Sequence, residues 1–332
     1  MTKRPLISVL VPTYNDGEFL DGTLASLAAQ SCADFEVVIS DDGSTDDSSA
    51  IAKEWSLRDS RFRAHRNPVN LGMTRNWNQA LSQAVGEFIV KLDGDDQMRP
   101  RCLELLLEEF HLRPDLFVAY CRTLECDQDM EPVSSYRGDN AFILNRMKPL
   151  HHHLRTGHEW YRLCFADYQL WHSNAQMHRR ESLLALGAWD ATWGCASDTD
   201  LILRVLEQDR LVSHVPYPGI RYRVRVGSVS DRFRKGNWLI WEGLLVHLLS
   251  LARYTQRGGA LNADLRKNWW RFWRHLQTLQ GDRRGELDGF PEPQRSNITG
   301  ALVRLTPPPA KVRLVGILRQ SLWNIRKKVK MS

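Results

Sequence analysis

The 332-residue chain has few cysteines and no long apolar run, and each absence limits the kind of protein it can be. Its six cysteines show neither a Cys-x-x-Cys pair nor the spacing of zinc ligands, which argues against a disulfide-stapled or zinc-stabilised domain. No stretch approaches the ~18–20 apolar residues that a membrane-spanning helix needs. No cleavable apolar leader precedes the first predicted strand, so we expect a reduced, cytoplasmic protein.

Three common binding signatures are also absent. The first predicted strand leads into Pro-Thr-Tyr-Asn-Asp-Gly, where a dinucleotide-binding domain needs Gly-x-Gly-x-x-Gly. No Walker A sequence occurs in the chain. The acidic run that begins at Asp93 lacks the third acidic ligand and the central glycine of an EF-hand loop. These three kinds of nucleotide or calcium site are therefore excluded.

The first 120 residues alternate between strand-like and helix-like segments. Apolar runs predict buried strands at residues 5–11, 35–40, 61–66, 88–92 and 116–120. Apolar residues at helical spacing predict helices at residues 17–30, 73–84 and 101–112. A strong helix start signal after the second strand predicts a further helix that ends at about residue 57. This alternation predicts an α/β fold with an open, mostly parallel sheet and helices on both faces.

Polar clusters follow three of the predicted strands at residues 12–16, 41–46 and 93–96. Ligands of such sheets bind beyond the carboxyl ends of the strands. One polar cluster at a strand end is ordinary, but three would converge on one rim of the sheet. The sequence therefore predicts a binding site at this rim.

The third cluster places Asp93, Asp95 and Asp96 within four residues, around Gly94. Carboxylates packed this closely repel one another and stay ionised together most easily beside a cation. Carboxylate oxygens are the ligands that Mg²⁺ and Mn²⁺ prefer, often together with substrate phosphates. The run by itself leaves two interpretations open, a metal–diphosphate site and a solvated acidic turn.

Four segments decide between these interpretations, and they occur in a fixed order: ISVLVPTYN at 7–15, VISDDGSTD at 38–46, NLG at 70–72 with RN at 75–76, and GEFIVKLDGDD at 86–96. Together they resemble the family 2 glycosyltransferases of GT-A fold. The likeness covers roughly residues 5–230. It implies a GT-A catalytic domain at 1–235, with a nucleotide-sugar-binding half at 1–120 and an acceptor-side half at 121–235. A helical, basic and aromatic C-terminal region follows at 236–332.

The resemblance implies an inverting transferase that moves a sugar from a nucleotide-diphosphate sugar, with a UDP-sugar expected, to a saccharide or lipid-linked saccharide acceptor. The pathway it implies is the assembly of cell-surface polysaccharide. The implied cofactor is a divalent cation, Mn²⁺ or Mg²⁺.

The resemblance also implies roles for individual residues. Tyr14, in the turn that Pro12 opens, would lie against the nucleobase. Asp42 would hold the base or ribose, and Arg75 would approach the base. The residues implied for ribose and metal are Asp93, Asp95 and Asp96, with Asp95 and Asp96 as the metal ligands.

The candidate general base is Asp198. Ser197, followed three residues later by Asp200 and then by an apolar run, predicts a capping-box-like helix start. Asp198 would then occupy the first helical position, where a helix N-terminus favours the ionised carboxylate that a base needs. The segment resembles the family's Glu-Asp-x-Asp-Leu-x-Leu-Arg, with Ser197 in place of the glutamate. The family's base matches Asp198, and we interpret Asp200 as structural.

Arg225 departs from the family pattern. Residues 222–230, YRVRVGSVS, resemble the family's Tyr-Arg-x-His-x-x-Ser-x-Ser, and Arg225 stands where the histidine would be. A guanidinium group does not ligate a metal, but it pairs bidentately with phosphate. The pattern therefore favours a phosphate clamp at Arg225 and leaves the third protein ligand of the metal open.

The formal net charge of +6 is unevenly distributed, because Arg, Lys and Trp accumulate after residue 253. Residues 311–330 combine apolar residues at helical spacing with Lys and Arg. Such a segment suits an anionic membrane surface, or a helix packed on the protein with a solvated basic side. We favour peripheral contact with the inner face of the cytoplasmic membrane, where glycolipid acceptors would be found. No nucleic-acid recognition module is visible.

Two alternatives use the same fold. A sugar nucleotidyltransferase would need a glycine-rich loop with Lys or Arg after the first strand, and the chain has none there. A catalytically silent sugar-binding or scaffold protein would not need the acids at the three strand ends, yet Asp42, Asp95 and Asp198 are present. The enzyme is therefore the favoured interpretation.

Overall fold

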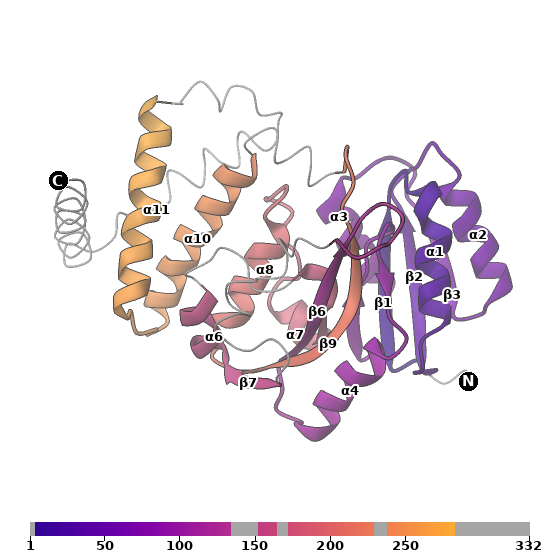
Figure 1. The fold of residues 1–332 in the computed structure, drawn as a ribbon, viewed down its shortest axis with the longest axis horizontal. Coiled ribbons are helices and arrows are strands. Elements are labelled where there is room, and N and C mark those ends of the chain that lie inside the picture. Colours follow the sequence, from indigo (N-terminus) through magenta and orange to yellow (C-terminus); the bar gives the residue numbers. More distant parts are fainter. Residues whose placement is uncertain (1–3, 134–151, 165–171, 229–237, 283–332) are drawn as a thin grey trace.

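The computed structural model describes residues 4–133, 152–164, 172–228 and 238–282 of the chain. The predicted boundary between residues 235 and 236 and the basic segment at 311–330 lie outside the described residues. One mixed sheet of nine strands runs through the described part, and helices lie on its faces (Figure 1).

The first four strands run parallel in the order β3-β2-β1-β4. Their bounds are β1 Ile7–Thr13, β2 Phe35–Asp41, β3 Phe62–Arg66 and β4 Phe88–Lys91. Every residue of β1, β2 and β4 is buried, which is why these strands read as continuous apolar runs. Because the strands are parallel, their carboxyl ends share one edge of the sheet.

Four helices cover this half of the sheet: α1 Gly17–Ala28, α2 Ser48–Arg58, α3 Met73–Gln83 and α4 Cys102–Leu112. The side chains of β1 alternate between two apolar clusters. Val9 belongs to the cluster that contains residues of α1, α2 and α4, and Leu10 belongs to the cluster that contains residues of α3. The predicted strands and helices of this half are confirmed, with small differences in their ends.

The second half of the sheet reverses direction. Strand β8 Gln176–Arg179 lies antiparallel between β4 and β6 Val118–Cys126. Strand β9 Leu211–Arg223 runs parallel to β6, and β5 Gln97–Met98 and β7 His153–Thr156 pair with it in antiparallel fashion. The short β5 follows directly after the acidic run, so its pairing brings the end of β9 beside that run.

The remaining helices are α6 Gly157–Cys164, α7 Arg180–Ala185, α8 Ser197–Leu206, α10 Trp238–Gln256 and α11 Ala263–Asp282. Helix α10 packs against α8, and α11 packs against α10 (Figure 1). Leu245 and Leu251 of α10 and Phe272 of α11 are fully buried, in the same apolar cluster as residues of α3 and α8. In the described residues no helix is both long and apolar enough to cross a membrane.

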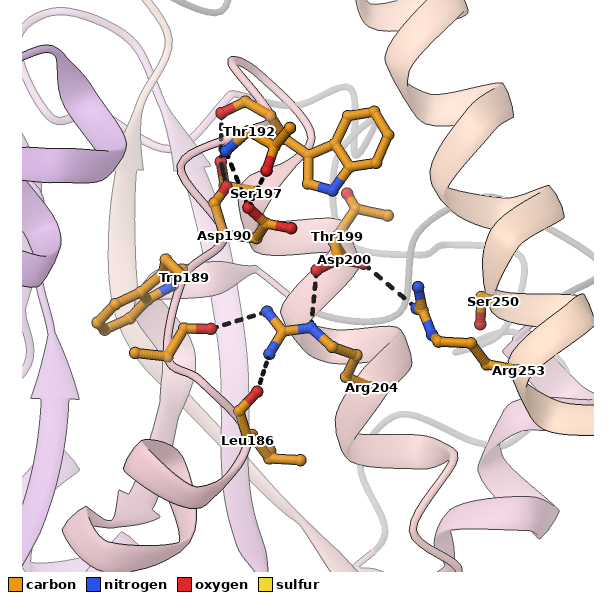
Figure 2. A network of polar contacts seen from close by, with 12 residues as sticks. Leu186, Trp189, Asp190, Thr192, Ser197, Thr199, Asp200, Arg204, Ser250 and Arg253 are labelled. Atoms are coloured by element: carbon orange, nitrogen blue, oxygen red, sulfur yellow. Dashed lines mark hydrogen bonds and ion pairs between the residues drawn. The ribbon is translucent and has the colours of Figure 1, made fainter. Parts of the chain in front are cut away.

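An ion-pair network fastens α10 to α8 (Figure 2). The guanidinium of Arg253 lies 3.2 Å from Asp200 and 2.9 Å from Glu207, whose side chains are 3% and 0% exposed. Ser250 donates a further hydrogen bond of 2.7 Å to Glu207. Asp200 also pairs with Arg204 of its own helix at 2.7 Å. The buried carboxylates of Asp200 in α8 and of Glu207 directly after it therefore share a cation from α10.

Replacing Arg253 by methionine should lower the free energy of unfolding by about 3 kcal/mol, because it leaves two buried carboxylates without their shared cation. Urea unfolding of the full chain measures the loss. Arg257→Met, at an exposed position one turn further on, is the matched control and should change stability by less than about 0.5 kcal/mol. Equal stability of Arg253→Met and the control would contradict the clamp between α8 and α10.

Candidate active site

The three polar clusters meet at the carboxyl edge of the parallel strands, as the sequence predicts. The amide of Asn15 donates to the hydroxyl of Ser44 at 2.9 Å, which joins the ends of β1 and β2. Gly94, after β4, packs so closely on Thr13 and Asp16 that an added Cβ would lie 2.9 Å from both side chains. One rim is therefore built from three segments that are distant in sequence.

Tyr14 is 44% exposed at this rim, directly after the buried end of β1 that contains Pro12. The next residue, Asn15, has φ of 55°, and this left-handed conformation turns the chain from β1 toward α1. The ring of Tyr14 therefore presents an accessible aromatic surface where a base would stack.

Asp42 is buried and holds the loop before α3. Its Oδ1 accepts hydrogen bonds from the amide of Leu71 at 2.8 Å and from the side chain of Asn67 at 3.0 Å, and its Oδ2 accepts one from the amide of Gly72 at 2.9 Å. Both oxygens are thus engaged by the protein. The contact with base or ribose that the resemblance implies stays a prediction.

Arg75 is exposed on the first turn of α3, directly after the loop that Asp42 holds. Within the described part of the chain its side chain makes no hydrogen bond and no ion pair. It is therefore available to an anionic or polar ligand at the rim.

A buried lysine organises the start of the acidic run. The ammonium of Lys91, at the end of β4, lies 2.5 Å from Asp93 and 2.6 Å from the side-chain oxygen of Asn174, and it sits over the ring of Trp77. The amide of Asn174 donates in turn to Asp96. Asn174 therefore links the two ends of the acidic run.

Asp96 has no exposed surface. It accepts hydrogen bonds from Asn174 and, at 2.8 Å, from the backbone amide of Arg223. Burial, together with the charges of Asp95 and Asp93, raises its pKa well above the usual value. The geometry gives Asp96 the position of a structural group that fastens the end of β9 to the acidic run.

Arg225 spans the rim. Its guanidinium lies 2.9 Å from Asp95 and 2.9 Å from Asp16, and so connects the acidic run to the turn after β1. Burial and the charge of Asp95 raise the pKa of Asp16 to about 7, while Arg225 and the hydrogen bonds from the Tyr14 amide and Thr13 act in the opposite direction. A single cation is shared by two carboxyl groups that disfavour each other's ionisation.

The rim can offer a divalent cation only a few protein ligands. Among the described residues, no group of three or more His, Cys, Asp or Glu side chains is placed to hold a metal. Oδ2 of Asp95 pairs with Arg225, whereas its Oδ1 makes no hydrogen bond with described residues. Asp95 is therefore the carboxylate that fits a cation, and a metal held by one carboxylate and substrate phosphates is a common arrangement. The assignment of Asp96 to the metal stays a prediction.

Asp198 lies on the first turn of α8. It is partly exposed, and its Oδ1 accepts a hydrogen bond of 2.6 Å from the amide of Thr199. Burial raises its pKa, the charge of Lys91 lowers it and the charge of Asp93 raises it. Asp198 is thus within electrostatic range of the acidic run, although more than 100 residues separate them in sequence.

The predicted capping box at the start of α8 is wrong. The N-cap residue is Ala196, and no side chain of the expected motif caps the helix. The hydroxyl of Ser197 donates instead to the carbonyl of Trp193 at 2.8 Å and shares a hydrogen bond of 2.7 Å with Thr74 of α3. Asp200 is engaged by Arg204 and Arg253 (Figure 2), which agrees with its structural interpretation.

Sequence analysis missed three residues of the site. Asp16 belongs to the polar cluster after β1, and its position there was a usable signal. Lys91 was a second signal, because a lysine within an apolar run must find a buried anionic partner. Asn174 lies in a segment, residues 171–181, that resembles the family's acceptor-side strand, but nothing in it pointed to a contact with the acidic run, which only the pairing of β8 with β4 and β6 creates.

This geometry can be compared with known proteins. Residues 8–171 match the model of glycosyl transferase family 2, and the chain belongs to this family. Over 234 residues it is 28% identical to the putative glycosyltransferase EpsH of Bacillus subtilis (strain 168), a match that covers 70% of this chain and 65% of EpsH.

A second relative matches over 106 residues at 34% identity, covering 32% of this chain and 34% of its own length: the GalNAc(5)-diNAcBac-PP-undecaprenol beta-1,3-glucosyltransferase of Campylobacter jejuni. The chain spans less than two thirds of the length of both relatives. The structure of S. aureus TarS 1–349 in complex with UDP-GlcNAc superposes with a TM-score of 0.60 at 19% identity, covering 90% of this chain and 79% of that one. The GT-A fold is therefore confirmed.

Asp95→Asn and Asp96→Asn should fail in different ways. Asp95→Asn removes the charge that faces a cation, so Mn²⁺ should no longer increase the affinity for UDP. Asp96→Asn disturbs buried hydrogen bonds and should lower the free energy of unfolding by about 1–3 kcal/mol. Calorimetric titration of UDP with and without Mn²⁺, and urea unfolding, measure the two effects. An Asp96→Asn protein of normal stability whose UDP binding ignores Mn²⁺ would instead make Asp96 the ligand.

Proposed function

We propose that this protein is an inverting glycosyltransferase that moves a sugar from a UDP-sugar to a saccharide or lipid-linked saccharide acceptor, in the assembly of cell-surface polysaccharide. One observation carries the proposal: the polar ends of three parallel strands form one rim, and Asp198 lies within electrostatic range of it. The names of the relatives support it, since EpsH is called a putative glycosyltransferase, the Campylobacter protein a glucosyltransferase, and TarS was crystallised with UDP-GlcNAc.

The nucleoside would bind along the ends of β1 and β2. The exposed ring of Tyr14 offers a stacking surface, and the guanidinium of Arg75, which has no partner among the described residues, offers hydrogen-bond donors to the base. Asp42 contributes by holding the loop directly before the helical turn that carries Arg75, while Asp93 supplies a partly exposed carboxylate for a ribose hydroxyl. These groups recognise the nucleotide part of the donor.

The diphosphate would bind beside Arg225. Its guanidinium is planar and can pair bidentately with phosphate oxygens while it remains near Asp95 and Asp16. Asp95 would hold the divalent cation, Mn²⁺ or Mg²⁺, which when bound stabilises the negative charge of the leaving diphosphate. Arg225 adds fixed positive charge at the same place, where it lowers the barrier to departure.

Inversion requires the acceptor hydroxyl to attack the anomeric carbon opposite the leaving group and to lose its proton as it does so. Asp198 would take that proton as the general base. Burial raises its pKa, which makes it a stronger base than an exposed aspartate, and the nearby charge of Lys91 keeps the ionised form accessible.

The reaction is tested by release of UDP from UDP-sugars, including UDP-GlcNAc, with Mn²⁺ or Mg²⁺ present and a thermal-shift screen of nucleotides in parallel. The matching nucleotide should increase the free energy of unfolding by RT ln(1 + [L]/Kd), and the melting temperature should rise as a result. Asp198→Asn should lower kcat by ~10²–10⁴ and leave nucleotide binding nearly intact. A protein that binds nucleotides but never turns them over would instead be the catalytically silent sugar-binding protein.

The pH profile gives a second readout. A base acts only when deprotonated, and the pKa of Asp198 is raised, so kcat should fall as the pH is lowered through a value above that of an ordinary aspartate. The acidic limb should be absent from the residual activity of Asp198→Asn. An unchanged limb in that variant would assign the base to another group.

We also propose that the enzyme is cytoplasmic and contacts the membrane peripherally through residues 311–330. The undecaprenol-linked substrate in the name of the Campylobacter relative supports a lipid-borne acceptor. Replacing Arg326, Lys327 and Lys328 by glutamine in the full chain should weaken sedimentation with phosphatidylglycerol vesicles about tenfold or more. Vesicles of phosphatidylcholine are the control, and equal binding by both proteins would remove the membrane role.

A further inference from the structure

Glu242 of α10 is a buried carboxylate with an unusual set of partners. It is 2% exposed, and it accepts hydrogen bonds from three consecutive backbone amides. Gly194 donates to its Oε1 at 3.0 Å, and Cys195 and Ala196 donate to its Oε2 at 2.7 and 3.1 Å. The thiol of Cys195 donates to Oε2 as well, at 3.2 Å. All these partners belong to the segment immediately before α8.

These contacts hold the turn that leads into α8. Ala196 is the N-cap residue, and Asp198 follows two positions later. The free amides at a helix start need an acceptor, and a carboxylate also interacts favourably with the helix dipole. The local sequence provides no cap, because the hydroxyl of Ser197 is used by Trp193 and Thr74. The acceptor for the preceding amides therefore comes from α10, more than 40 residues further along the chain.

The start of α8 is held from two sides. The hydroxyl of Thr74, on α3, contacts Ser197 at 2.7 Å, and α3 in turn begins at the loop that Asp42 holds. Glu242 holds the amides of the residues just before Ser197. Thr74 contacts only the hydroxyl of Ser197 in this turn. Among the described residues, Glu242 is the acceptor for the three consecutive amides of residues 194–196.

We propose that Glu242 is a positioning residue for Asp198, so that α10 is part of the catalytic apparatus. This proposal rests on the proposed function, in which Asp198 is the general base. Glu242 contacts neither the donor rim nor Asp198 itself. It acts through the backbone, by fixing the turn from which the Asp198 side chain extends. A displacement of about 1 Å at a reacting group can cost ~10²-fold in rate.

The test is Glu242→Gln in the full chain, assayed by UDP release from UDP-GlcNAc or from the UDP-sugar that the donor screen selects. The amide keeps the shape of the side chain but turns one acceptor into a donor that faces the Cys195 and Ala196 amides. We expect kcat to fall by about 10–100-fold while KM for the donor changes less than about twofold. Hydrogen exchange of the 194–196 amides should become faster, a readout that needs no activity.

Glu207→Gln is the matched control. Glu207 is also a buried glutamate at the contact of α8 with α10, but it lies beyond the far end of α8, after Leu206. Its replacement should lower stability while kcat of the folded protein stays within about twofold of the parent. A loss of kcat equal to that of Glu242→Gln would mean that any weakening of the helix contact has the same effect, and would overturn the proposal.

The double variant separates positioning from general damage. If Glu242 acts through Asp198, Glu242→Gln should lower kcat by less than about twofold in the Asp198→Asn background, because the base is already lost. An equal loss in both backgrounds, or no loss in the parent, would overturn the role of Glu242. If Asp198→Asn alone turns over normally, the assignment of the base has failed, which is a different result.

Discussion

The burial of Asp96 is the constraint around which the rim is arranged. A carboxyl group with no exposed surface must receive hydrogen bonds from the protein, and its donors come from Asn174 and from the backbone of Arg223. Those two contacts hold the turn before β8 and the end of β9 against the acidic run. Arg225 follows two residues later, close enough to pair with Asp95 and Asp16. The position of the proposed phosphate clamp thus depends on a neighbouring buried acid.

A second set of buried charges holds α8, the helix that carries the proposed base. Asp200 of α8 and Glu207, directly after this helix, share Arg253 of α10, and Glu242 of α10 binds the amides before α8. Helix α10 therefore supplies a cation to two buried carboxylates and a carboxylate to the amides that precede α8. Their apolar contacts add to the same core as the sheet helices, so α8 is fixed at its start and beyond its end. In our proposal it is the contact of Glu242 with the turn before α8 that keeps the Asp198 side chain at a constant place.

Much of the fold was predictable because its first half follows local rules. Parallel strands buried on both faces require continuous apolar residues, and the runs at β1, β2 and β4 show them. Strand β8 was not predictable in the same way, because QMHR carries no apolar pattern and is buried only by its two neighbours. The cap of α8 was mispredicted for a related reason: Ser197 has the right residue type, but Trp193 and Thr74 compete for its hydroxyl.

The sequence by itself determined the class of fold, the rim with its three polar clusters and the family to which the chain belongs. Each strand and each polar cluster is a local pattern, and the carboxyl ends of parallel strands share one edge of the sheet. Only the tertiary structure decided which acids are exposed and which are structural. Asp95 and Asp96 are adjacent and chemically identical. Asp95 pairs with Arg225 at the rim, whereas Asp96 is fully buried and hydrogen-bonded to the end of β9. Burial and hydrogen-bond partners make that difference, and both are properties of packed segments from distant parts of the sequence.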